Sequence, residues 1–186
     1  MNSSGDLMDL GQFFTSADLI GIAPEIILTI TALSILTLEM FRVSRTGIIL
    51  LVAAIGLLLA VGTAANIGGD KQFLFGGMLV LSRFSVFFDF LYISIGLVTL
   101  IFSQGYLEKR GSASRGEYPA LILFAVIGMM LMSKANDLVI VFLGLELLSL
   151  SLYILVGFLR HDQLSNESGL KYLLLGAFAT GFFLFG

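Results

Sequence analysis

A single glutamate, Glu146, lies near the middle of an apolar stretch that runs from Leu138 to Leu159. About 20 apolar residues are enough for a helix to cross a bilayer, so this stretch predicts a membrane span with an acid close to its midplane. A charged group at that depth costs about 2.5–3.5 kcal/mol, and intramembrane acids usually face a bundle interior or an aqueous path. The position therefore predicts a proton- or ion-handling role. The alternative is a protonated acid that hydrogen-bonds to a neighbouring helix for packing alone.

Four further polar residues have spacings that suit such a role. Ser149 and Tyr153 share a helix face with Glu146, where hydroxyl groups can donate to a carboxylate or hold a water. Glu167 and Lys171 are one helical turn apart with the acid first, the better order for an ion pair. We expect Lys171 to act at the entry to the span, with waters or further residues bridging to Glu146. The alternatives are ordinary interhelical hydrogen bonds and a lysine that reaches for the membrane surface.

The composition is that of a membrane protein. Hydrophobic residues make up 58% of the 186 residues and charged residues 12%, about half the charged fraction of a soluble domain. The absence of cysteine excludes disulfides, Fe–S clusters and thiolate metal sites in this chain, and one histidine argues against haem or zinc. A net charge of −3 does not suggest nucleic-acid binding. No phosphate-binding or nucleophile motif is present, so we expect no cofactor in this chain.

Six apolar segments of helical length follow one another and predict an all-α, polytopic membrane helix bundle. Their expected bounds are Pro24–Phe41, Thr46–Ala65, Phe84–Leu107, Tyr118–Met132, Leu138–Leu159 and a sixth that begins near Glu167 and is still running at Gly186. A short surface hairpin is expected over 73–82, a basic loop over 108–115, and an N-cap at Asn136 or Asp137. The unfinished sixth helix predicts that the sequence is the first part of a longer protein. This helix also carries two small-residue pairs, Gly176 with Thr180 and Ala177 with Gly181, which predict close packing against another helix.

Basic residues are unevenly divided between the two sides of these spans. Three lie in loops on the N-terminal side (Lys71, Arg83 and Lys134) and seven on the other (Arg42, Arg45, Lys109, Arg110, Arg115, Arg160 and Lys171). Cytoplasmic loops carry the excess of Lys and Arg, so the N-terminus is predicted to lie outside.

The first 18 residues lack the basic start of a signal peptide, and we expect a multi-pass protein of a bacterial inner membrane. Asp89, a few residues inside the third span, is interpreted as an interfacial or packing residue.

Two segments carry a family resemblance. SKANDLVIVFLGLELLSLSLYILVGFLRHD, followed by NESGLKYLLLGAFATGFFLFG, resembles the antiporter-like membrane subunits of respiratory complex I. The resemblance implies about fourteen membrane helices with two inverted five-helix repeats. Glu146 matches the family's helix-5 glutamate, which is thought to pair with a helix-7 lysine, and Glu167 and Lys171 match the pair at the start of helix 6. The chain would then divide into a three-helix region, 1–117, and the start of the first repeat, 118–186.

The resemblance also implies a function. The protein would be a proton-translocating membrane-arm subunit of an NADH:quinone oxidoreductase, without a redox centre of its own. NADH, FMN, Fe–S clusters and quinone would be bound at the level of the complex, and the partners would be other membrane-arm subunits and lipid, not nucleic acid. The alternatives are a subunit of a multisubunit cation/proton antiporter or membrane-bound hydrogenase, and a membrane scaffold that transports nothing.

Overall fold

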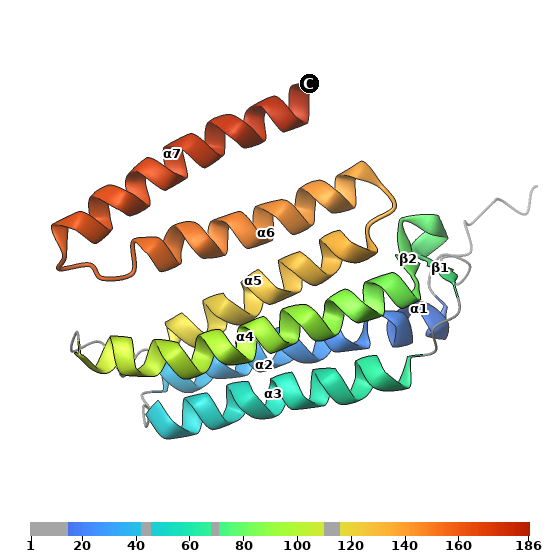
Figure 1. The fold of residues 1–186 in the computed structure, drawn as a ribbon, viewed down its shortest axis with the longest axis horizontal. Coiled ribbons are helices and arrows are strands. Elements are labelled where there is room, and N and C mark those ends of the chain that lie inside the picture. The colour runs from blue at the N-terminus through green and yellow to red at the C-terminus, as the bar shows by residue number, and fades with distance from the viewer. Residues whose placement is uncertain (1–14, 42–45, 68–70, 110–115) are drawn as a thin grey trace, which may run out of the picture.

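The computed structural model describes residues 15–41, 46–67, 71–109 and 116–186, which form one bundle of antiparallel helices (Figure 1). Within these ranges six helices are long and apolar enough to cross a membrane, which confirms the predicted fold class. They are α2 (Ala23–Met40), α3 (Thr46–Asn66), α4 (Arg83–Lys109), α5 (Glu117–Lys134), α6 (Leu138–Val156) and α7 (Gln163–Phe185). A short helix that the sequence did not predict, α1 (Ser16–Gly21), precedes them.

The helices lie in successive layers, and α5 is the most buried of the six. It packs against α2 and α4 on one side and against α6 on the other, and α7 packs against α6 (Figure 1). The core therefore lies between α2, α3, α4 and α5, with Leu28, Leu57, Ile93 and Leu123 among its buried members. Because α5 contacts helices of both proposed regions, no gap in packing marks the division at residue 117, which stays a prediction.

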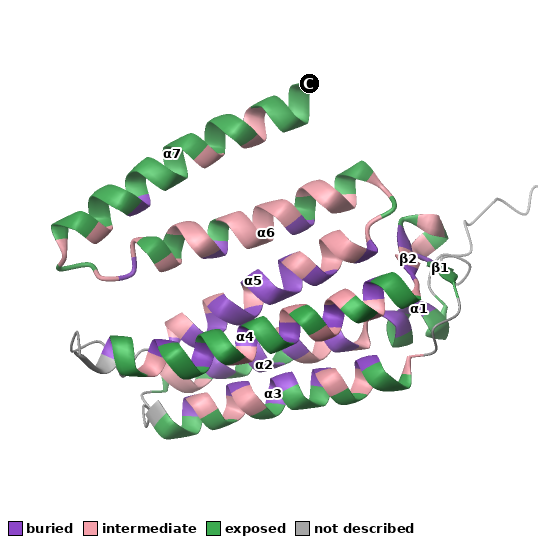
Figure 2. Ribbon diagram, in the orientation of Figure 1, coloured by how far each residue is buried: buried purple, intermediate pink, exposed green. Residues whose placement is uncertain are grey.

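Many large apolar side chains are exposed on the helices, as expected for helices that face lipid. In Figure 2 α7 is exposed along nearly all of its length, and Gly169 is its one buried residue. Aromatic and aliphatic side chains such as Phe178, Phe182 and Leu175 are more than two-thirds exposed. A soluble monomer rarely carries an apolar surface of this extent, so this face is suited to lipid or to another membrane helix.

Glycines set the approach of α6 to its neighbours. A Cβ atom added at Gly128 of α5 would overlap the backbone of α6, and one added at Gly144 of α6 would overlap the backbone of α5. A similar close contact joins Gly157, just after α6, to Gly169 of α7. Small residues of this kind let membrane helices pack at short distances, and they fix the position of α6 between α5 and α7.

Side-chain caps decide where two of the helices begin. Asp137 accepts a hydrogen bond from the Val139 amide at 2.8 Å, which confirms one of the two predicted caps of α6. Asp162 caps α7 in the same way through Leu164 at 3.0 Å, so α7 begins at Gln163 and not near Glu167. The predicted end of the preceding helix at Leu159 is also wrong, because α6 ends at Val156 and Gly157 follows as its C-cap.

The predicted hairpin forms and covers one end of the bundle, called here the hairpin end. Strands β1 (Gln72–Leu74) and β2 (Leu79–Leu81) are antiparallel and joined by a 3-10 turn, η2 (Phe75–Gly77). The Phe75 amide donates to Asp18 of α1 at 2.9 Å, and the Asn136 side chain donates to the Gly77 carbonyl at 2.8 Å. These bonds tie the hairpin to α1 and to the junction between α5 and α6.

Candidate intramembrane proton site

Glu146 occupies the middle of α6 and meets a hydroxyl group from α7. Thr180 Oγ1 donates a hydrogen bond to Glu146 Oε1 at 2.7 Å. Both residues are partly buried in the seam between the two antiparallel helices. The sequence did not identify Thr180 as a partner, although its place in a small-residue pair with Gly176 predicted close helix packing there. The contact gives an acid near the membrane midplane one defined polar neighbour.

Tyr153 lies in the same seam, two turns of α6 away from Glu146. Its ring fills the space left by the absent side chain of Gly176, because a Cβ atom there would overlap the phenol group. Its ring also contacts Tyr172 edge to face, with centroids 4.9 Å apart. Gly176 and Thr180 are one turn apart, about 6 Å along the helix. The Tyr153 phenol and the Thr180–Glu146 pair therefore follow one another along the seam.

Ser149 and the second small-residue pair of α7 are placed differently. Among the described residues, Ser149 is half-buried and has no hydrogen-bond partner. Ala177 is exposed, and a Cβ atom at Gly181 would meet no described atom within 4 Å. The pair of Ala177 and Gly181 thus makes none of the predicted helix contacts within the part of the chain that the structure describes.

The ion pair predicted at the start of the last helix forms but lies apart from Glu146. Lys171 Nζ is 2.5 Å from Glu167 Oε1, and both side chains are more than half exposed. Nine residues separate Lys171 from Thr180, a rise of about 13 Å along α7. The predicted site residues therefore fall into two groups: Glu146 with Tyr153 inside the seam, and Glu167 with Lys171 at the surface.

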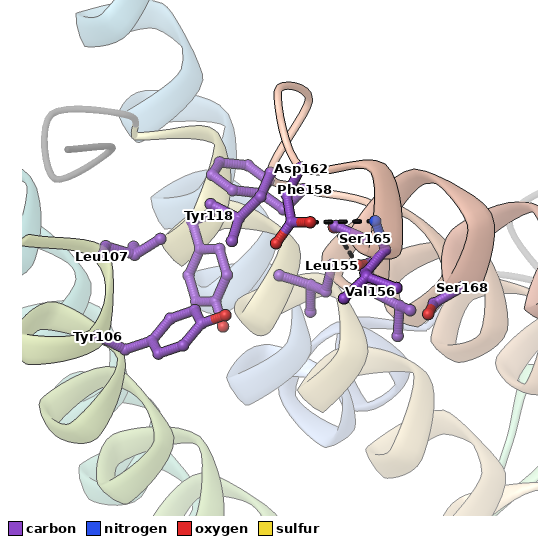
Figure 3. A pocket seen from close by; sticks show the side chains of 11 residues that line it. Tyr106, Leu107, Tyr118, Leu155, Val156, Phe158, Asp162, Ser165 and Ser168 are labelled. Carbon is purple, nitrogen blue, oxygen red and sulfur yellow. Dashed lines mark hydrogen bonds between the residues drawn. The ribbon is translucent and has the colours of Figure 1, made fainter. Parts of the chain in front are cut away.

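A cavity of about 350 Å³ opens at the other end of the bundle, where α6 ends and α7 begins. Figure 3 shows the hydroxyl groups of Tyr106 and Tyr118 close together on one side of it, and Asp162 and Ser165 on the other. Ser168 of α7 also lines it, one turn before Tyr172. Polar side chains therefore lie at intervals along the interface between α6 and α7, from Ser168 at the cavity to Tyr153 and Tyr172 and then to Glu146.

A second group of charges lies at the hairpin end and was missed in the sequence. Lys134, predicted to lie in a loop, is the last residue of α5 and is fully buried. Its Nζ contacts Glu25 Oε1 of α2 at 2.5 Å and Asp89 Oδ2 of α4 at 2.9 Å. Of the two roles interpreted for Asp89, interfacial or packing, its full burial against Lys134 agrees with packing. One signal was available in the sequence. Glu25, Asp89 and Lys134 each lie near the end of an apolar segment, and because consecutive spans run in opposite directions, these three ends lie on the same side of the bundle.

Comparisons with known proteins agree with this architecture. Residues 135–186 match the family model described as NADH:quinone oxidoreductase/Mrp antiporter, TM. NADH-quinone oxidoreductase subunit N 1 of Solibacter usitatus is 40% identical over 183 residues, which are 96% of this chain and 37% of that protein. Subunit N of Trichlorobacter lovleyi is 38% identical, with the same shares covered. The chain thus spans little more than a third of the length of these relatives.

A solved structure shows the same fold. A chain of respiratory complex I from Thermus thermophilus superposes with a TM-score of 0.72 at 28% identity, covering 87% of this chain and 35% of that one. The resemblance seen in the sequence is confirmed by these independent matches in sequence and structure. The chain is therefore a relative of the NADH-quinone oxidoreductase subunit N proteins, to which it is similar along nearly its whole length.

Proposed function

We propose that this chain forms part of a proton-translocating membrane-arm subunit of an NADH:quinone oxidoreductase, and that Glu146 is the group that takes up and releases the proton. The observation that carries the proposal is the Glu146 carboxylate in the middle of a membrane-spanning helix, hydrogen-bonded by Thr180. A structural salt bridge does not account for it, because no described Lys or Arg contacts Glu146. A carboxylate without a fixed counter-charge in an apolar layer is suited to gaining and losing a proton.

The neighbours of Glu146 are suited to both protonation states. The Thr180 hydroxyl donates to the carboxylate, and its oxygen can accept from the protonated acid after the hydroxyl rotates. Tyr153 lies against Gly176, one turn of α7 nearer the cavity, and in this proposal water joins its hydroxyl group to Glu146. A proton would therefore pass between the cavity and Glu146 along the α6–α7 seam, with Lys171 and Glu167 at its surface end.

The energy for this transfer would come from other subunits. No described group of three His, Cys, Asp or Glu side chains could hold a metal ion, and the redox cofactors NADH, FMN, Fe–S clusters and quinone are proposed to be bound elsewhere in the complex. A change in charge or position of a cation beside Glu146 would change its proton affinity. In this proposal that cation belongs to the part of the subunit that the relatives have and this chain does not cover.

The proposed orientation places the hairpin end outside a bacterial inner membrane. The burial of Lys134 in an ion pair removes it from the exposed charges at this end, which leaves Lys71 and Arg83 against seven basic residues on the other side. The positive-inside rule applies to loop charges, so the imbalance is larger than the sequence predicted. The cavity beside Asp162 would then open toward the cytoplasm.

The Thr180 hydroxyl supplies a direct test of the seam. Thr180→Val keeps the shape of the side chain but removes the donor to Glu146, and we expect it to lower the protons pumped per NADH oxidised. Thr180→Ser keeps the hydroxyl and is expected to pump like the unaltered protein. The measurement is proton uptake by vesicles that contain the whole complex, at matched amounts of assembled enzyme. Equal pumping by both variants would contradict a role for this hydrogen bond.

Purification of the native subunit tests the proposed partners. We expect the protein isolated from its own membrane to bring NADH dehydrogenase and other membrane-arm subunits with it, identified by mass spectrometry. A second candidate function is that of a subunit of a multisubunit cation/proton antiporter or membrane-bound hydrogenase, and the Mrp antiporter in the matched family description supports the antiporter. Isolation with antiporter or hydrogenase subunits would favour this second function. Isolation without any such partner would contradict both proposals.

A further inference from the structure

Three buried charges from three different helices meet at the hairpin end of the bundle, and the mechanism above uses none of them. Glu25 lies in the first turn of α2, Asp89 in the second turn of α4, and Lys134 at the end of α5. The Lys134 and Asp89 side chains are fully buried, and that of Glu25 is 5% exposed. We refer to these three residues as the buried triad.

The formal charges of the buried triad do not cancel. With both acids ionised, one ammonium group faces two carboxylates and the net charge is −1. An uncompensated charge in a medium of low dielectric constant is strongly destabilised by the loss of its hydration, and a protein avoids this by changing the protonation state of the group. One further cation would make the triad neutral.

The hydrogen-bond geometry indicates where that cation is held. Lys134 donates a hydrogen bond to Glu25 Oε1. Its Nζ also lies 2.9 Å from Asp89 Oδ2, but the angles of this ion pair are not those of a hydrogen bond. Glu25 Oε2 and both oxygens of Asp89 are buried without a hydrogen-bond partner. Buried carboxylate oxygens normally accept several hydrogen bonds, so Asp89 is the acid whose surroundings least support a negative charge.

We propose that the buried triad is a proton-binding site, in which Asp89 holds one proton beside an ionised pair of Glu25 and Lys134. A metal cation is a poor occupant, because the Lys134 ammonium already lies against both carboxylates and would repel it. A proton forms a covalent O–H bond on one oxygen and needs no such space. The site is separate from Glu146. The buried triad lies between α2, α4 and α5, whereas Glu146 lies between α6 and α7.

The surroundings add no other compensating charge among the described residues. Tyr92 follows Asp89 by one turn of α4 and is neutral in its ordinary state. From α1, Asp18 binds the backbone amides of Thr15 and Phe75, and at the start of α6 Asp137 caps the helix. Arg83, at the start of α4, is exposed. The triad therefore has to reach neutrality by itself.

Infrared spectroscopy of the whole complex, with aspartate side chains labelled with ¹³C, tests the proposal. A protonated aspartic acid gives a carbonyl band that shifts in D₂O. We expect one such band to be lost in Asp89→Asn, which keeps a polar group beside Lys134. The band should also be lost in Glu25→Gln, although that residue carries no label, because Asp89 then becomes the only counter-charge of Lys134 and ionises. Glu146→Gln should retain it.

The result in Glu25→Gln decides between a proton site and a fully ionised cluster. Unchanged spectra in both triad variants would mean that Asp89 carries no proton and would overturn the proposal. A band lost in Asp89→Asn but retained in Glu25→Gln would overturn the charge balance on which the site is built. Should Asp89→Asn fail to assemble, Glu25→Gln alone decides, because the labelled aspartic acid band is either lost or kept in the spectrum of that variant. Neither outcome depends on whether Glu146 translocates protons.

Discussion

Replacement of Glu146 by glutamine is expected to stop proton transfer through this subunit while the complex still assembles. Glutamine keeps the size of the side chain and a carbonyl oxygen that can accept from Thr180, but it cannot take up a proton at any accessible pH. Removal of a group that transfers protons typically slows a step by about 100-fold or more. The measurement is the number of protons pumped per NADH oxidised, in vesicles that contain matched amounts of assembled complex.

The control for this variant is Glu167→Gln, which removes the same charge from an exposed ion pair. Exposed ion pairs contribute about 0–1 kcal/mol, so we expect little change in assembly, and any change in pumping would measure the role of the surface pair. The scaffold alternative makes the opposite prediction for Glu146. Under that alternative Glu146→Gln pumps fully because the hydrogen bond to Thr180 survives, and only Glu146→Leu fails, at the stage of assembly.

The helices and their order could be predicted because the physical signals for them are local. A run of about 20 apolar residues is enough to identify a membrane span, and all six predicted spans are present. The cap at Asp137 and the hairpin around Gly76 and Gly77 depend on residues that are adjacent in sequence, and both are confirmed. Gly76 and Gly77 adopt φ angles of 63° and 94° there, which glycine tolerates without strain.

The contacts that define the two sites could not be predicted in the same way. Thr180 and Glu146 are separated by 34 residues, and Lys134 and Glu25 by 109. Which residues meet across such separations depends on the rotation of each helix about its axis. The helices here are apolar on all sides, so they show little of the periodicity that would fix that rotation. The glycine contacts between α5 and α6 fix it in the structure, and a single sequence does not identify which glycines pair.

Lys134→Met is expected to cause a large loss of stability in the bundle. Methionine fills a similar volume but removes the ammonium group from the buried carboxyl groups of Glu25 and Asp89, of which the ionised one loses its counter-charge. Removal of one partner from a buried ion pair costs about 3–5 kcal/mol, because the remaining charge is left without compensation. Thermal unfolding of the purified complex, or the amount of the subunit in the membrane, measures the loss. Lys171→Met, which removes an exposed lysine, is the matched control and should change little.

The origin of this loss can be separated from a simple packing defect. If uncompensated charge is the cause, Lys134→Met combined with Glu25→Gln and Asp89→Asn should regain much of the stability, because no buried charge remains. The deficit of the single variant should also shrink as the pH falls, since each carboxyl group becomes neutral when it binds a proton. A deficit that is the same at every pH and in the triple variant would mean that the Lys134 side chain acts through its shape, and that the charges of Glu25 and Asp89 do not determine how α2, α4 and α5 are held together.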